Sequence, residues 1–170
     1  MAQLLRFWLG LCLLRAAPQD LPASRWLLGF SIICYATVSV LAMTLSYGFA
    51  DGVRVALLEL GLLAVFVSML LYLLNKPARI GQTLSALTGA GALLGLPALL
   101  LVMVAAPESG TAQPVSVAWL LLLIWNLLVT AHIMRHALSS SLVIGLGVSL
   151  LYTLVSTQFI MTSFPQLAGQ

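Results

Sequence analysis

The sequence predicts an all-α fold, a polytopic transmembrane helix bundle of five spans preceded by a short interfacial amphipathic helix. Two observations lead to this fold class. The 170-residue chain is 62% hydrophobic and only 6% charged, whereas a soluble domain carries about 25% charged residues. The apolar residues also gather into runs that approach the roughly 20 residues needed to cross a bilayer as a helix. So few charged groups cannot cover a globule in water, and lipid must therefore surround most of the chain.

Residues 1–15 predict a helix that lies in the headgroup layer of the membrane. The apolar run from Phe7 to Leu14 is too short to span, and Arg6 and Arg15 bracket it. A cleaved signal peptide is the alternative, but Arg15 stands where cleavage requires small residues. The apolar face of this helix would consist of Leu4, Phe7, Trp8, Leu11 and Leu14, and the polar face of Gln3, Arg6 and Gly10.

Five spans are expected after this segment. Pro18 and Pro22 interrupt the chain before the first span, and Ser24 can cap it. The later connections are a tight turn at 48–54, a basic loop at 75–82, a polar stretch at 106–114 and a boundary at 132–136. The spans should cover about residues 26–48, 53–74, 83–105, 116–134 and 139–162, so that residues 1–170 form a single integral membrane domain.

The basic residues predict the orientation of the bundle. Lys76 and Arg79 form a basic loop with no acid beside them, and six of the basic residues fall on the side of this loop, against Arg54 alone on the other. The positive-inside rule then places the loop and the N-terminus in the cytoplasm and the C-terminus outside. Asp20, the acid on the cytoplasmic side, would either tether the N-terminal segment to this loop or remain solvated.

Three polar residues at membrane depth form a candidate intramembrane site. Glu59 lies inside the second span, where an isolated carboxylate costs roughly 2.5–3.5 kcal/mol, and Arg54 is its nearest possible partner in sequence. Glu59 would serve either as a proton or cation relay, or as a buried carboxyl that orients helices, with Asn126 as its partner. Asn126 and Gln158 are expected to form modest hydrogen bonds between helices.

The third predicted span carries two small-residue motifs. Ser85 and Gly89 lie four residues apart, as do Gly91 and Gly95. Such spacing places small side chains on one face and lets helix backbones approach closely. These residues are therefore expected to pack against another helix, either within the chain or in a partner membrane protein.

Motifs for catalysis, metal binding and nucleic-acid binding are missing from the sequence. His132 and His136 lie four residues apart, but a closed metal site needs about four ligands, so neither a metal nor another cofactor is expected. Cys12 and Cys34 are too few for a disulfide framework and should act as small hydrophobic residues. The basic residues are scattered without an aromatic platform, which argues against nucleic acid as a partner. No nucleophile, phosphate loop or carboxylate pair appears, and an enzyme is not expected.

The layout of an interfacial segment, a proline-rich link and five spans resembles the Yip1-like family of membrane proteins. Residues 7–22, FWLGLCLLRAAPQDLP, look like the entry to its bacterial members. The resemblance implies a non-enzymatic protein that works through contacts with other membrane proteins. We therefore expect a scaffold, assembly factor or accessory subunit of a bacterial inner membrane, in contact with lipids and with other membrane proteins or itself. The alternative is a small transporter or proton-coupled carrier that uses Glu59.

Overall fold

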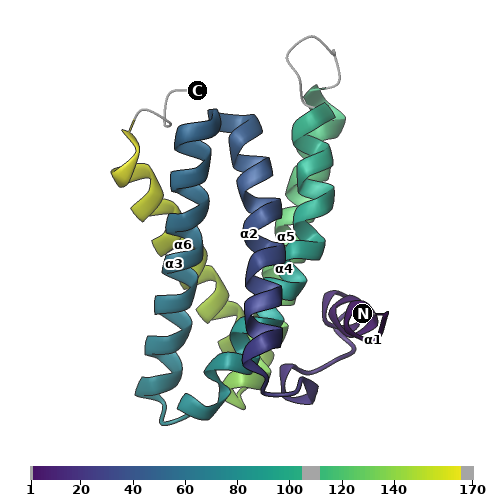
Figure 1. Ribbon diagram of the computed structural model, residues 1–170, viewed down its shortest axis with the longest axis vertical. Coiled ribbons are helices and arrows are strands. Elements are labelled where there is room, and N and C mark those ends of the chain that lie inside the picture. The colour runs from purple at the N-terminus through teal and green to yellow at the C-terminus, as the bar shows by residue number, and fades with distance from the viewer. Residues whose placement is uncertain (1, 105–111, 166–170) are drawn as a thin grey trace.

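The computed structural model describes residues 2–104 and 112–165, and within these ranges the chain is helical, with no strand (Figure 1). The helices are α1 (Ala2–Cys12), α2 (Arg25–Tyr47), α3 (Phe49–Leu73), α4 (Ile80–Val104), α5 (Ala112–Leu138) and α6 (Leu142–Ser163). Two short 3-10 turns, Pro18–Asp20 and Pro77–Arg79, precede α2 and α4. The five helices from α2 to α6 are long and apolar enough to cross a membrane, which confirms the predicted all-α transmembrane bundle.

The connection between α2 and α3 is shorter than the expected turn at 48–54. Gly48 alone separates the two helices, and its φ of 80° lies in the left-handed region that glycine adopts without strain. Residues 49–54 therefore belong to α3, and the prediction that the second span begins at Val53 is wrong by one helical turn. Gly52 lets the two backbones meet beyond the turn, since an added Cβ would lie 2.5 Å from the amide nitrogen of Thr44.

The polar connection predicted at 106–114 is only partly described. Residues 106–111 lie outside the described ranges, and residues 112–114 already form the start of α5. A proline is compatible with the first turn of a helix because its missing amide hydrogen has no partner there. The predicted boundary at 132–136 between the fourth and fifth spans is also displaced. The helix α5 continues through His132 and His136 to Leu138, and α6 begins at Leu142 rather than at 139.

The long helices alternate in direction, and α4 lies at the centre, packed against α1, α2 and α5. We call the end of the bundle formed by residues 15–25, 74–80 and 139–141 the basic end, and the end formed by Gly48 the far end. Figure 1 shows the long helices nearly side by side, with α1 seen end-on beside the lower part of the bundle. The same view shows α5 and α6 diverging toward the far end.

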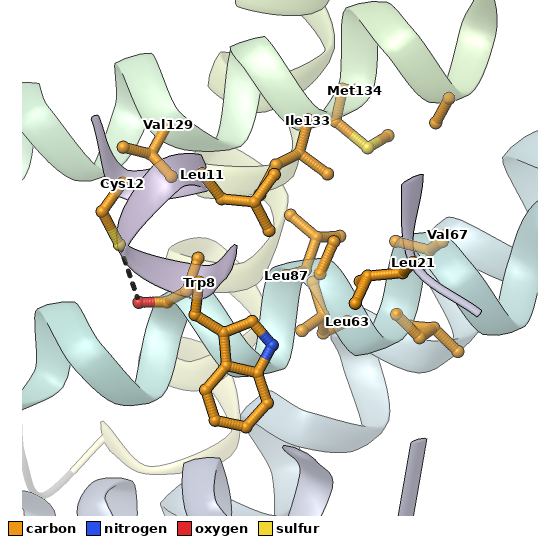
Figure 2. Close-up of a cluster of buried hydrophobic side chains, with 14 of the residues drawn as sticks. Trp8, Leu11, Cys12, Leu21, Leu63, Val67, Leu87, Val129, Ile133 and Met134 are labelled. Carbon is orange, nitrogen blue, oxygen red and sulfur yellow. Dashed lines mark hydrogen bonds between the residues drawn. The ribbon is translucent and has the colours of Figure 1, made fainter. Parts of the chain in front are cut away.

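The apolar face of α1, the segment predicted to lie in the headgroup layer, is covered by protein. Trp8 and Leu11 are buried against α4 and α5, and the Cys12 thiol donates to the carbonyl of Ala90 at 3.8 Å (Figure 2). A second apolar stripe, formed by Leu5 and Leu9 of α1 and by Leu13 just after it, remains exposed. The helix α1 is therefore packed against the bundle along one face and exposed along another.

Stacked aromatic rings also connect α1 to α2. The ring of Trp8 stacks on that of Phe30 with centroids 6.0 Å apart, and Phe30 stacks on Trp26 at 5.4 Å. Stacked aromatic pairs of this kind contribute about 0.5–1.5 kcal/mol beyond the area they bury. The first helix is thus held by both α2 and α4.

The tightly packed core occupies the half of the bundle near the basic end. Its buried side chains come from α1 to α5 and the link before α2, and include Leu11, Leu21, Val67, Leu87 and Ile133 (Figure 2). In lipid, apolar side chains gain little from leaving the solvent, so close packing and hydrogen bonds must supply most of the stability. This core therefore fixes the relative positions of the helices at the basic end.

Candidate functional site

The half of the bundle near the far end contains a cavity of about 540 Å³, to which all five long helices contribute. Its walls are mainly apolar, and polar groups enter from α2, α3, α5 and α6. Leu63 and Leu87 line the cavity and also belong to the packed core. The core therefore closes the cavity toward the basic end.

Glu59 of α3 lines this cavity and is surrounded by hydroxyl groups. The hydroxyl of Ser39 donates to Oε2 of Glu59 at 3.4 Å, and the Tyr35 side chain lines the cavity close to the same carboxyl group. Tyr152 of α6 also lines the cavity and lies close enough to interact electrostatically with Glu59. Hydroxyl donors are suitable partners for a carboxylate, which can only accept hydrogen bonds.

Glu59 does not form the ion pair expected from the sequence. Arg54 instead pairs with Asp51, with Nη1 3.3 Å from Oδ1, and the Arg54 side chain is exposed. Within residues 2–104 and 112–165, no Lys, Arg or His lies within 4 Å of Glu59. The carboxyl group at the cavity wall therefore lacks a cationic partner from the part of the chain that the structure describes.

The other two residues of the predicted polar site have different positions. Asn126 of α5 lines the cavity together with Glu59, but no hydrogen bond joins the two side chains. Gln158 lies on an exposed part of α6 and does not contribute to the cavity. The structure thus brings together two of the three residues, and the proposed pairing of Glu59 with Asn126 is not present.

The small residues of α4 pack within the chain, as one of the two alternatives predicted. An added Cβ would collide with Trp8 at Gly89, with Tyr35 at Gly91 and with Val38 at Gly95. Ser85 is buried and donates its hydroxyl to the carbonyl of Gly81 in its own helix at 2.8 Å. Gly91 and Gly95 also line the cavity. They allow α2 to approach α4 and so place Tyr35 beside Glu59.

The predicted basic loop caps the end of α5. The Arg79 guanidinium donates to the carbonyls of His136 and Ala137, at 3.3 and 3.0 Å, and to the Ser139 hydroxyl at 2.6 Å. The Lys76 ammonium donates to the carbonyl of Leu138. The last carbonyls of a helix lack partners and carry the negative end of its dipole. This loop therefore has a structural role in joining α4 to the C-terminus of α5.

The link between α1 and α2 is fixed to the same helix end. The Gln19 side chain donates to the carbonyl of His136 at 2.8 Å, and His132 Nε2 lies 2.9 Å from the carbonyl oxygen of Ala16. Asp20 accepts from the amide of Ala17 at 3.2 Å. It caps its own turn and does not tether the segment to the basic loop, as one of the two interpretations had suggested.

The described residues contain no cluster of three or more His, Cys, Asp and Glu that could hold a metal ion. His132 and His136 contact each other edge to face, with centroids 4.8 Å apart. Cys12 is buried, and burial raises the pKa of its thiol to about 11. These groups therefore contribute to packing at the basic end, away from the cavity.

Sequence reasoning missed the partners of Glu59. Tyr35 and Ser39 are four residues apart, so that both face the cavity from one side of α2. This spacing of two polar side chains in an apolar span was the available signal. Tyr152 is separated from them by more than a hundred residues and gives no local signal.

The fold and the cavity define the chain as a polytopic α-helical membrane protein with an acidic group in a cavity within its spans. Comparisons with protein families, with curated proteins and with solved structures find no match for this chain.

Proposed function

We propose that the protein binds a small, largely apolar molecule in the cavity between its spans, with Glu59 as the polar contact. The main support is that the Glu59 carboxyl lines a cavity of about 540 Å³. Ligand sites are commonly concave, mostly apolar and about 300–1,000 Å³ in volume, with few polar groups. The cavity has each of these properties.

The free-energy cost of placing a carboxyl group within a membrane span supports the same proposal. An ionisable group within a span costs at least a few kcal/mol and is a functional candidate by default. Among the described residues, the carboxyl group accepts a hydrogen bond from the Ser39 hydroxyl of α2, and it also lines the cavity.

This proposal is related to the carrier alternative but stops short of transport. The packed core between Leu63, Leu87 and the basic end leaves the cavity closed on that side. A carrier would have to separate these helices during each cycle. Binding requires no such movement, and binding is therefore the function that we propose.

A cavity-filling substitution tests the proposal. Ala98 lines the cavity, whereas Leu100 on the same helix is 62% exposed. Protein in lipid nanodiscs would be titrated with a panel of small amphiphiles of positive, zero and negative charge. We expect at least one member to bind the wild type and Leu100→Phe but not Ala98→Phe. If no member distinguishes Ala98→Phe from the wild type, the cavity is not a binding site.

A scaffold or accessory subunit remains a second candidate, and one observation favours it. Asn126 and Gln158 lie within the spans with exposed side chains, where amides often contact another helix. Co-purification in mild detergent, compared between the wild type and a chain carrying Asn126→Leu and Gln158→Leu, tests this function. A wild-type chain that purifies as a single copy without partners would contradict it.

We also propose that the protein resides in a bacterial inner membrane, with its basic end in the cytoplasm. Support comes from the gathering of Arg25, Lys76, Arg79 and Arg135 at the basic end, while Arg54 lies toward the far end. Membership of the Yip1-like family stays a prediction from the sequence layout.

A further inference from the structure

We propose that the ligand of the cavity is an organic cation, an amine or quaternary ammonium compound with an apolar body, and that Glu59 is its counter-ion. This inference rests on the proposed function and specifies its ligand. It follows from the charge, the hydrogen bonds, the aromatic lining and the opening of the cavity.

The described lining of the cavity contains an acidic side chain but no basic one. Glu59 is the acidic residue that lines it, and the described lining includes no Lys, Arg or His. A carboxylate has about four acceptor positions, and the hydroxyl of Ser39 occupies one of them. The remaining positions can accept a donor or face a positive charge from the ligand. A cation would supply what the described part of the chain does not.

The lining also suits an organic cation. Four aromatic residues contribute to the cavity, namely Tyr35, Tyr47, Trp119 and Tyr152. Aromatic faces attract a cation within about 6 Å of the ring, and quaternary ammonium groups are commonly recognised in this way. Tyr35 and Tyr152 lie next to Glu59, so that the carboxyl group and the aromatic rings could act on one ammonium group.

A bare inorganic cation fits the cavity less well. Calcium takes 6–8 oxygen ligands at short distance, whereas the carboxyl group of Glu59 is accompanied by hydroxyl and amide groups from Ser39, Tyr35 and Asn126 in a cavity of about 540 Å³. Of the 21 lining residues, 11 are Leu, Val, Ala or Gly. An apolar body attached to the cation would fill this space.

The opening of the cavity indicates how such a ligand arrives. Trp119, Leu123 and Asn126 of α5 line the cavity and are also exposed on the surface of the bundle. Figure 1 shows that α5 diverges from α6 on this half of the molecule. An amphiphile could therefore enter along α5 from the membrane, with its apolar part remaining in lipid until the charged group reaches Glu59.

The test compares a cation with its neutral isostere. A hexyltrimethylammonium probe would be titrated into nanodisc-embedded protein beside the hydrocarbon in which carbon replaces the nitrogen. We expect the cation to bind wild-type protein at least about tenfold more tightly than the isostere. Glu59→Gln should remove most of this ratio. Asp51→Asn, which removes a carboxylate from the same helix outside the cavity, should preserve it.

The outcomes separate the inference from the proposed function. If the isostere binds as tightly as the cation, and Ala98→Phe abolishes binding of both, the cavity binds ligands but the cation inference is wrong. If neither probe binds in a manner sensitive to Ala98→Phe, both proposals fail. Should Glu59→Gln prevent folding, the wild-type ratio of the two affinities still decides the inference, since a ratio near one overturns it.

Discussion

The indole ring of Trp8 occupies the space that a side chain on Gly89 would need. An added Cβ at Gly89 would collide with three atoms of this ring, Nε1, Cε2 and Cδ1. Trp8 is only 4% exposed and also stacks on Phe30. The contact between α1 and α4 therefore depends on a large side chain in one helix and on the absence of a side chain in the other.

The substitution Gly89→Ala should destabilise the protein by about 1–3 kcal/mol, the range for overpacking a filled site. The indole must move and take α1 with it. The free energy of unfolding, measured by denaturant titration in detergent micelles, gives the readout. Gly61→Ala is the matched control, because nothing lies within 4 Å of a Cβ built there, and it should be neutral or slightly stabilising.

A double substitution identifies the cause of that loss. In a Trp8→Ala background, Gly89→Ala should cost much less than it does in the wild type, because the colliding ring is gone. Contacting residues show such coupling, whereas distant ones add within about 0.5 kcal/mol. Additive costs for the two substitutions would contradict the docking of α1 on α4.

Because Arg79 caps the C-terminus of α5, we expect Arg79→Lys to lower the free energy of unfolding. Lysine keeps the charge, and hence the orientation signal, but it loses the planar group that reaches three acceptors. We expect a loss of about 1.5–3 kcal/mol of unfolding free energy, the value of a hydrogen bond to a charged group. Arg15→Lys, at an exposed position, should have little effect. Equal effects of the two substitutions would show that the cap contributes nothing.

The orientation can be tested with single cysteines at the two ends of the bundle. Ala50 near Gly48 and Ala78 in the basic loop are both exposed. With Cys12 and Cys34 replaced by Ala, an impermeant maleimide should label Ala50→Cys in intact cells and Ala78→Cys only after permeabilisation. The reverse pattern would invert the orientation, and labelling of both from one side would contradict the bundle itself.

The buried thiol of Cys12 should react slowly with alkylating reagents. The thiolate is the nucleophile, and burial raises the pKa of Cys12 from 9.0 to about 11. At pH 8 its thiolate fraction should be about 100-fold lower than in the unfolded chain, and its reaction rate should increase until the pH reaches this higher pKa. Iodoacetamide labelling of a Cys34→Ala chain, with and without denaturant, measures the difference. Equal rates in both states would show that α1 is not docked.

Hydropathy was sufficient to predict the spans, because apolar length alone determines which segments can cross a bilayer. It could not predict the docking of α1. The side chains of Trp8 and Leu11 suit lipid and protein equally well, so amphipathic spacing shows that a face is apolar without showing what covers it. The opposing residue, Gly89, appeared in the sequence only as part of a general packing motif.

The site was predictable in part for similar reasons. Glu59 was apparent because a carboxyl group is rare within a span. Its partnership with Tyr35 and Ser39 depends on how closely α2 approaches α4 at Gly91, which is a property of the assembled bundle. Gln158 was expected to form a hydrogen bond between helices, and this depended on which face of α6 is directed inward.

The docking of the first helix on the fourth and fifth has a consequence for biosynthesis. α1 leaves the ribosome first, but its binding surface is complete only when α5 has emerged. At about 5–20 residues per second, that interval is on the order of ten seconds. Until then, Trp8 and its neighbours must rest in the lipid surface or against the insertion machinery, so that the docking of α1 follows the synthesis of α2 to α5.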